Sequence, residues 1–316
     1  MKKKNIIIYL VLSGLIAAFM PCKYMIICYL LLLASVRKVK IFILNLYYNL
    51  VYFIKHLFSK NKLRLYDKDD RKEKIIVSLT TYSKRIKNVF LAIESIFEQE
   101  VKPDKIVLWL DKDEFTIDSL PKTLKKQIKQ GLEVDFYHNI KSYKKIVPSL
   151  KKYPNDIIIT IDDDILYKKD CIKNLYSSYL NNKNAVHCNY LFKFLNEKLL
   201  PTAGIKDIKY LFNYIGTGGG ALFPPHILPS DILDEELFMK LAPIHDDLFI
   251  SVLLYEQNTK IINVNKDYLY YTKLIQKRMI LNTQSIGLFN ENYFKNKTKT
   301  QLINLLDHYK ITLKEV

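Results

Sequence analysis

Residues 156–164 read DIIITIDDD, a run of β-branched residues that ends in three carboxylates. Such a run, bounded by polar residues, predicts a strand that is buried on both faces of a sheet. Three adjacent carboxylates repel one another unless a cation or hydrogen bonds compensate their charge. Carboxylate oxygens suit Mg²⁺ or Mn²⁺ that bridges to a diphosphate. The stretch therefore predicts a metal-binding strand end, with a solvated acidic turn as the alternative.

Outward from this stretch, strand and helix patterns alternate. Similar strands are expected at 74–79, 105–110 and 132–138, and helices at 88–99, 120–130 and 143–152. Further helices are expected at 168–181 and 246–257, with a strand at 259–264. This alternation predicts an α/β domain with a mostly parallel central sheet. In such sheets ligands bind at the carboxyl ends of the strands.

Common nucleotide-binding loops do not follow the first expected strand. The sequence there is TTYSKR (80–85), which has neither the GxGxxG dinucleotide pattern nor the GxxxxGK[ST] phosphate loop. The chain is therefore not expected to be a dinucleotide-dependent enzyme or a P-loop NTPase. Asp111, which closes the second strand, is a candidate for reading a nucleobase.

A second acidic group, His245-Asp246-Asp247, opens the helix expected at 246–257. One aspartate suffices to cap a helix N-terminus, so the other is available as a general base. His245 is either a metal ligand or a structural histidine.

A glycine-rich block, GTGGG, occupies residues 216–220 and holds four of the eight glycines in the chain. A plain tight turn would need one or two glycines. The block therefore indicates close approach of the backbone to a ligand or left-handed backbone geometry.

Five blocks together resemble the GT-A-fold glycosyltransferases, in particular the family-2-like enzymes of bacterial lipopolysaccharide and capsule assembly. They are IIVSLTTYSKRI (75–86), IESIFEQEVKPDKIVLWLD (93–111), SYKKIVPSLKKYPNDIIITIDDDILY (142–167), GTGGGALFPP (216–225) and HDDLF (245–249). The resemblance covers roughly residues 74–265.

The resemblance implies a single GT-A-type nucleotide-sugar-binding domain that transfers a sugar from a UDP- or GDP-sugar to a hydroxyl of a glycan or glycolipid acceptor. The cofactor would be Mn²⁺ or Mg²⁺. The nucleotide-binding residues would be Thr80, Thr81, Tyr82, Arg85, Asp111, Lys145, Asp162 and Asp163. The metal ligands would be Asp162, Asp164 and His245, with Asp164 the direct ligand of the triplet. The loop of Gly218, Gly219 and Gly220 would border the donor sugar and the acceptor. Asp247, or failing it Asp246, would be the base of an inverting reaction.

Two other functions are alternatives to the glycosyltransferase. A metal-dependent phosphohydrolase would use Asp162–Asp164, although Leu166 stands where the haloacid-dehalogenase pattern has Thr or Val. A non-catalytic membrane-bound scaffold is the other alternative, against which the intact acidic and glycine blocks argue.

The N-terminal region differs from the rest in charge and hydropathy. Of the net charge of +17, eleven basic groups lie in residues 1–65, which contain no acid. The other 251 residues carry only +6, which argues against a nucleic-acid partner. Apolar segments at 5–20 and 24–36 are each short for a bilayer span. The segment 41–60 predicts an amphipathic helix whose polar side chains form one narrow stripe facing water: Asn45, Asn49, Lys55, His56, Ser59 and Lys60.

These patterns predict four parts of the chain. Residues 1–62 would attach it to a membrane surface, 63–73 form a charged linker, 74–285 form the glycosyltransferase domain, and 286–316 form a C-terminal helical extension. The expected location is the bacterial inner membrane with the catalytic domain facing the cytoplasm; a Golgi-type lumenal arrangement is the alternative. The four cysteines show no CxxC spacing, so reduced thiols are expected and zinc is not.

Overall fold

A computed structural model describes residues 37–60, 62–65, 71–195, 198–201, 212–264 and 297–311. The chain divides into two compact units, Met1–Tyr48 and Asn49–Val316. Helix α3 (Arg37–Phe58) begins in the first unit and ends in the second. The apolar segments expected at 5–20 and 24–36 lie outside the described residues. Among the helices that are described, none has both the length and the apolar character needed to cross a membrane.

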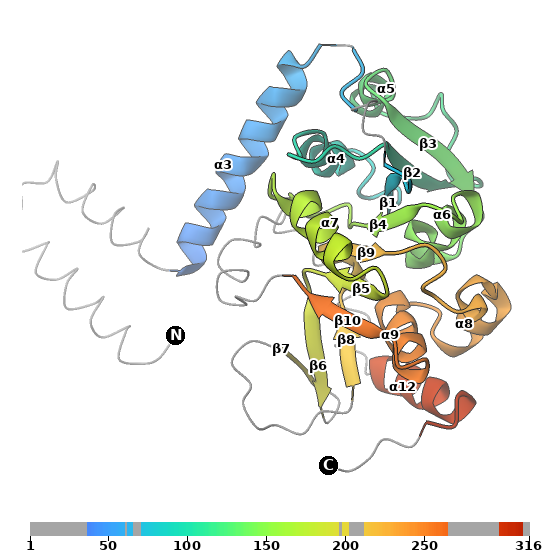
Figure 1. The fold of residues 1–316 in the computed structure, drawn as a ribbon. Helices are drawn as coiled ribbons and strands as arrows, with labels where there is room; N and C mark the ends of the chain where they lie inside the picture. Colours follow the sequence, from blue (N-terminus) through green and yellow to red (C-terminus); the bar gives the residue numbers. More distant parts are fainter. Residues whose placement is uncertain are drawn as a thin grey trace, which may run out of the picture. The chain divides into compact units, whose positions relative to one another are not determined.

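The second unit is built on a seven-stranded sheet with the order β10-β5-β9-β4-β1-β2-β3 (Figure 1). Its strands are β1 (Ile75–Thr80), β2 (Lys105–Asp111), β3 (Leu132–Tyr137), β4 (Ile157–Thr160), β5 (Ala185–Cys188), β9 (Ala221–Phe223) and β10 (Lys260–Asn263). Only β9 runs antiparallel to its neighbours in this sheet. The prediction of an α/β domain with a mostly parallel central sheet is therefore confirmed.

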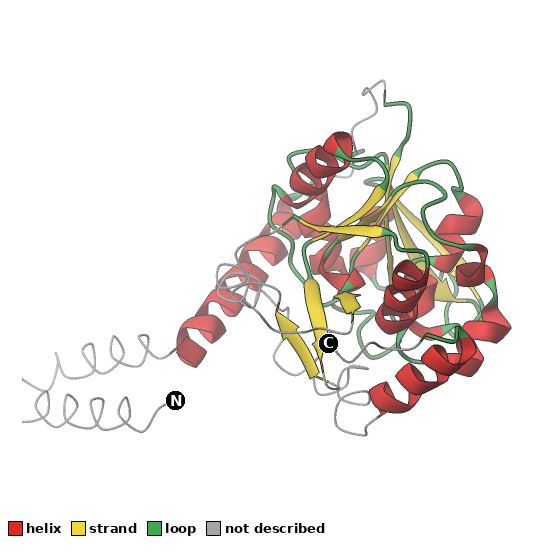
Figure 2. Cartoon of the chain, turned by 60° about the horizontal axis from the view of Figure 1, so that its bottom comes forward, coloured by secondary structure: helices red, strands yellow, loops and turns green. Residues whose placement is uncertain are grey.

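Helices cover both faces of this sheet, as Figure 2 shows. They are α4 (Val89–Phe97), α5 (Lys122–Ile128), α6 (Val147–Lys152), α7 (Cys171–Asn181), α8 (Glu235–Leu241), α9 (Asp246–Glu256) and α12 (Lys297–His308). Short 3₁₀ turns are η1 (Lys141–Lys145), η2 (Thr217–Gly219) and η3 (Ser230–Leu233). One core cluster joins β5 and β9 to α8, α9 and α12 through Phe223, Phe238, Phe249 and Leu305, among others.

The single helix expected at 143–152 was wrong. The structure has the 3₁₀ turn η1 followed by the separate helix α6, with Ile146 between them. Pro148 is the reason, because proline lacks an N–H and fits best in the first turn of a helix. The turn places Lys144 and Lys145 in the interior of the domain.

A smaller antiparallel sheet, β7-β6-β8, lies beside the start of α9 and was not predicted. Its strands are β6 (Leu191–Leu195), β7 (Lys198–Pro201) and β8 (Phe212–Ile215). The N–H of Ile215 donates to Ser251 Oγ at 3.0 Å, which ties β8 to α9. This sheet thus holds the start of the glycine-rich loop against the helix that carries the second acidic group.

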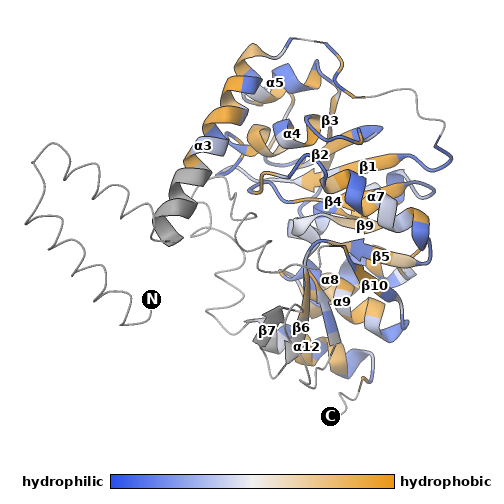
Figure 3. Cartoon of the chain, turned by 60° about the vertical axis from the view of Figure 1, so that its left-hand side comes forward, coloured by the Kyte–Doolittle hydropathy of each residue, from blue (hydrophilic) through white to orange (hydrophobic). Residues whose placement is uncertain are grey.

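Most of the described polar stripe at the end of α3 packs against the domain and does not face water as predicted, although Lys60 is exposed. His56 is buried and its Nδ1 lies 2.9 Å from Oε1 of the buried Glu94, while Lys55 pairs with Glu98. Gln130 donates to Ser59 Oγ at 2.8 Å. The carboxylates of Glu94 and Glu98, and Gln130 beyond the end of α5, therefore find hydrogen-bond partners on this stripe, since a buried carboxylate needs partners. In Figure 3, which colours the backbone by residue hydropathy, hydrophobic positions recur along α3.

Candidate active site

The candidate site lies at the carboxyl ends of β1, β2 and β4. Thr80 of β1 lies opposite Trp109 of β2, and Ser78 of β1 lies opposite Thr160 of β4. The residues that follow these strands therefore share one edge of the sheet. Antiparallel β9 brings the glycine-rich loop to the same edge, because Ala221 pairs with Thr160.

Two of the three aspartates after β4 are compensated by an arginine. Arg85 Nη1 lies 2.6 Å from Asp163 Oδ1 and 3.2 Å from Asp164 Oδ2. Thr81 Oγ1 also donates to Asp163 Oδ2 at 2.5 Å. Burial alone would lower the pKa of Arg85, but the two carboxylates outweigh it and raise that pKa. The repulsion expected within the triplet is thus partly relieved from within the chain.

The remaining aspartate of the triplet, Asp162, is joined to the second acidic group by Lys145. Its Nζ lies 3.0 Å from Asp162 Oδ1 and 3.0 Å from Asp246 Oδ2. Burial would lower the pKa of Lys145, but Asp162 and Asp246 outweigh burial and hold the pKa well above its ordinary value. Residues about 85 positions apart in the sequence therefore form one charged cluster around a buried ammonium group.

Helix α9 delivers Asp247 into the same cluster. Its Oδ1 accepts hydrogen bonds from the N–H of Thr217, at 3.0 Å, and from the Thr217 hydroxyl. Burial and the neighbouring charge of Asp246 raise the pKa of Asp247 to about 7. Burial likewise lowers the pKa of His245 to about 4, so its imidazole is neutral. Asp246 behaves in the opposite way, because Lys145 outweighs the effect of burial and keeps its pKa below the ordinary value.

The glycine-rich loop packs directly on this cluster. A Cβ added at Gly218 would lie 1.8 Å from Asp162 Oδ2, and one at Gly219 would lie 1.7 Å from Tyr190 Cδ2. Gly220 has φ of +93°, as left-handed geometry requires. The close approach that the glycines allow is therefore to the chain's own side chains.

Asp111 lies at the same edge but has a different partner. It is 5% exposed, accepts the N–H of Asp113 at 3.0 Å, and lies 3.5 Å from Lys144 Nζ. Thr80 Oγ1 donates to the carbonyl of Trp109, and Tyr82 lies beside Arg85. Because Lys144 and Lys145 are consecutive, η1 links Asp111 to the acidic cluster.

Sequence reasoning missed three residues of the site. Thr217 binds Asp247 and lies inside the glycine block, so its position could have been inferred. Tyr167 accepts the N–H of Asp162 at 2.8 Å and donates to the carbonyl of Gly218. Tyr214 Oη lies 3.5 Å from Asp247 Oδ2 and 3.5 Å from His245 Nδ1. Tyr167 closes the block 142–167, three residues after Asp164, whereas nothing in the sequence around Tyr214 distinguishes it from the other tyrosines.

The oxygen and nitrogen atoms of the predicted metal ligands have the chemistry that a hard divalent cation prefers. Asp162 has the most exposed side chain of the triplet, at 39%, whereas Asp164 is 16% exposed and lies against Arg85. Aspartate oxygens and a neutral imidazole are ligands that Mn²⁺ accepts. Within the described part of the chain, however, no three His, Cys, Asp or Glu side chains are grouped as a metal site would require. Lys145 lies where Asp162 and Asp246 converge, so a cation there would compete with its ammonium group.

Comparisons with known proteins give distant similarities. No protein-family model matches the chain, and no curated protein matches it. Among solved structures, GalNAc-T7 with UDP, GalNAc and Mn²⁺ is similar at a TM-score of 0.41 and 12% identity, over 67% of this chain and 48% of that one. The chain thus spans about half the length of that protein.

Two further structures show similarity at the same level. A mannosyltransferase from Pyrobaculum calidifontis, in complex with GDP-Man and Mn²⁺, has a TM-score of 0.39 and 12% identity over 86% of this chain and 84% of that one. A CMP:2-keto-3-deoxy-manno-octonic acid synthetase complexed with CTP has a TM-score of 0.37 and 10% identity over 61% and 88%. At these scores the similarities assign no function to the chain.

Proposed function

We propose that the chain is a metal-dependent glycosyltransferase that moves a sugar from a UDP- or GDP-sugar to a hydroxyl of a glycan or glycolipid acceptor. The observation that carries the proposal is Lys145, which joins Asp162 of the first acidic group to Asp246 of the second at 3.0 Å each. Two of the five blocks that suggested the family, 142–167 and 245–249, therefore meet in one charged cluster, which supports the proposal.

The two aspartates of α9 have separate roles in this proposal. Asp246 is engaged by Lys145, so it positions that lysine and stays ionised. Asp247 accepts the proton of the acceptor hydroxyl as the oxygen attacks the anomeric carbon and the bond to the diphosphate breaks. A base with a pKa near 7 suits this step, because it can take up and release a proton near neutral pH. Attack from the face opposite the diphosphate gives inversion.

The donor would lie along the carboxyl edge of the sheet. Thr80, Thr81, Tyr82, Arg85 and Asp111 would line the nucleotide, and Gly218, Gly219 and Gly220 would border the sugar. A divalent cation would offset the negative charge that builds up on the departing diphosphate, and Asp162, the most exposed carboxylate of the triplet, is the residue placed to contact it. Lys145 contributes a fixed positive charge beside Asp162.

The acceptor side of the proposal rests on the N-terminal region. The basic, apolar residues 1–62 suit attachment to a membrane, and lipid-linked or surface glycans are made there. We therefore propose lipopolysaccharide or capsule assembly at the bacterial inner membrane, with the catalytic domain on the cytoplasmic side.

Release of UDP or GDP from a panel of nucleotide sugars tests the proposal, using the full chain with Mn²⁺ and a lipid-linked glycan acceptor. Asp247→Asn keeps the size of the side chain and removes the base, so we expect turnover to fall by about 100-fold or more. Asp118→Asn, an exposed aspartate outside the site, is the matched control and should keep full activity.

Three results would contradict the proposal. Normal turnover by Asp247→Asn would exclude Asp247 as the general base. Turnover that EDTA does not lower would exclude the requirement for a metal ion. Phosphate release from monoesters in place of nucleotide release would favour the phosphohydrolase.

A further inference from the structure

The outward face of α3 carries large apolar side chains. Leu50, Phe53, Ile54, Leu57 and Phe58 are between 43% and 82% exposed. Their spacing of three and four residues places them on one side of the helix. A continuous apolar face of this kind on a folded protein marks an interaction site.

The opposite side of α3 is occupied, so the helix cannot turn its apolar face inward. His56 and Lys55 pair with Glu94 and Glu98, and the Nζ of Lys126 donates to the carbonyl of His56 at 2.5 Å and to that of Leu57 at 3.1 Å. Rotating the helix would leave the buried carboxylate of Glu94 without His56, at a large free-energy cost. The apolar face is therefore held outward by ionic contacts within the second unit.

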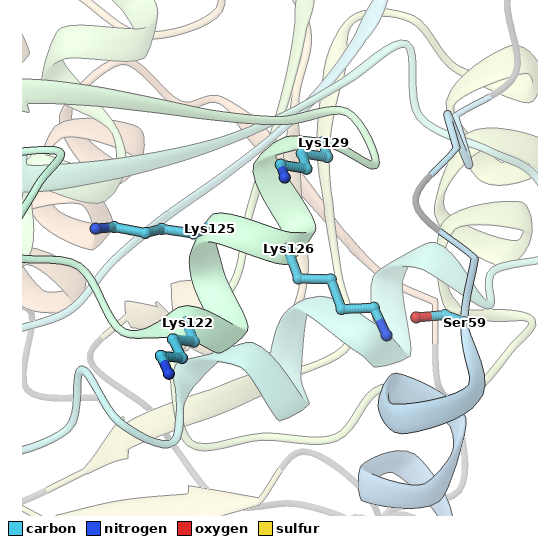
Figure 4. A pocket seen from close by; sticks show the side chains of 5 residues that line it. All are labelled: Ser59, Lys122, Lys125, Lys126 and Lys129. Carbon is cyan, nitrogen blue, oxygen red and sulfur yellow. The ribbon is translucent and has the colours of Figure 1, made fainter.

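A basic pocket begins where this apolar face ends. Ser59, directly after Phe58, lines a cavity of about 370 Å³ together with Lys122, Lys125, Lys126 and Lys129 (Figure 4). These five lining residues include no carboxylate. The ammonium group of Lys125 also donates to the carbonyl of Asp118, as that of Lys126 does to the end of α3. The lining still carries four positive charges, so the pocket favours an anion with several oxygens.

The two features together match the profile of a bilayer surface, which has an apolar interior beneath a layer of phosphates. We propose that the α3–α5 surface, formed by the apolar face of α3 and the pocket of Ser59 and the four lysines, docks on an anionic phospholipid bilayer. The pocket takes a phospholipid headgroup phosphate, while Leu57 and Phe58 enter the acyl boundary. This site belongs to the same compact unit as the sheet and does not depend on the proposed catalysis.

Quenching of tryptophan fluorescence by brominated lipids tests the contact of α3 with lipid. Full-length Phe58→Trp is placed in vesicles that contain brominated phosphatidylcholine. The wild-type chain gives the background, because its single tryptophan, Trp109, is 3% exposed. Ile303→Trp on α12, which is 46% exposed, is the matched control. We expect strong quenching at position 58 and none above background at position 303.

The headgroup pocket is tested by exchanging the brominated lipid for brominated phosphatidylglycerol at the same mole fraction. Each lysine near an anionic surface contributes about fivefold to binding, so we expect phosphatidylglycerol to quench position 58 several-fold more strongly. A triple variant keeps Lys126 at the end of α3 and carries Lys122→Gln, Lys125→Gln and Lys129→Gln. In this variant the two lipids should quench fluorescence at position 58 equally.

Distinct results would overturn the proposal. Absence of quenching at position 58 by either lipid would mean that the N-terminal segment, a second copy or another protein covers α3. Equal quenching by both lipids in the chain with all four lysines would exclude the headgroup site. Loss of the preference on adding millimolar glycerol phosphate would assign the pocket to a soluble phosphate compound.

Discussion

Replacing Arg64 with methionine should strongly destabilise the domain. Arg64 Nη1 lies 2.6 Å from Oε2 of Glu94, whose side chain is fully buried, and the guanidinium lies 4.6 Å from the centre of the Phe97 ring. Methionine keeps an apolar stem of similar length and removes the guanidinium, which also lies over Phe97 and pairs with Glu98 at 3.1 Å. Glu94 then keeps His56 and Gln127, at 2.9 Å each, as its remaining partners.

The size and pH dependence of this effect follow from the burial of Glu94. Breaking one partner from a buried ion pair costs about 3–5 kcal/mol. At about 2–4 °C per kcal/mol for a domain of this size, the melting temperature should fall by roughly 10 °C at pH 7. Burial would raise the pKa of Glu94, but His56 and Arg64 outweigh it and lower the pKa. The stability supplied by these partners is therefore present above the unfolded pKa of Glu94 and is lost as the pH falls through the folded pKa. The difference between variant and wild type should accordingly shrink in acid.

Thermal unfolding of the full chain in detergent, followed by fluorescence at pH 7 and pH 4, measures the effect. Lys173→Met removes an exposed pair with Glu100 and should leave the melting temperature unchanged. In the double variant Glu94→Gln with Arg64→Met the buried charge is absent, so much of the lost stability should return. A double variant as unstable as Arg64→Met alone, or a shift of less than about 2 °C for Arg64→Met, would refute the electrostatic reasoning.

Two further predictions concern the candidate active site. Gly218→Ala places a Cβ 1.8 Å from Asp162 Oδ2 and displaces that carboxylate, so nucleotide release should fall by about 100-fold or more. The control is Gly131→Ala, where φ is +108°: it should lower the free energy of unfolding by about 1–2 kcal/mol and leave turnover per folded molecule unchanged. Since Asp247 must be deprotonated to act as a base, its pKa of about 7 predicts that kcat/KM falls about tenfold per pH unit below pH 7 and levels off above it; a flat profile from pH 5 to pH 8 would exclude Asp247 as the base.

The sheet and the position of the acids could be predicted from the sequence. Runs such as IIVSL and IIITI are too apolar to face water on either side, so a parallel sheet covered by helices is the arrangement that buries them. Polar residues then follow the strands at one edge, and Thr81, Asp111 and Asp162 lie at the ends of β1, β2 and β4.

The orientation of α3 could not be predicted in the same way. Amphipathic periodicity shows that a helix has two unlike sides, but it does not show which side contacts the domain. That choice depends on Glu94, which stands in a helix whose other residues are mostly apolar and gives no local sign of being buried. The link through Lys145 was equally hidden, because it depends on η1 ending before Pro148 and turning two consecutive lysines toward different carboxylates.

The place of β9 in the sheet determines the order in which the site can form during synthesis. β5 is made before β9, yet it joins the rest of the sheet only through β9, which pairs with β4 on its other side. An emerging chain can therefore assemble β1 to β4 and its arginine-bound aspartates first, whereas β5 must wait for residues 221–223 before it can join them. Thr217 and the two aspartates of α9 arrive still later than β5. A chain interrupted before residue 245 would thus contain the aspartates that follow β4 and lack both aspartates of α9, so the charged cluster around Lys145 cannot form until α9 has been made.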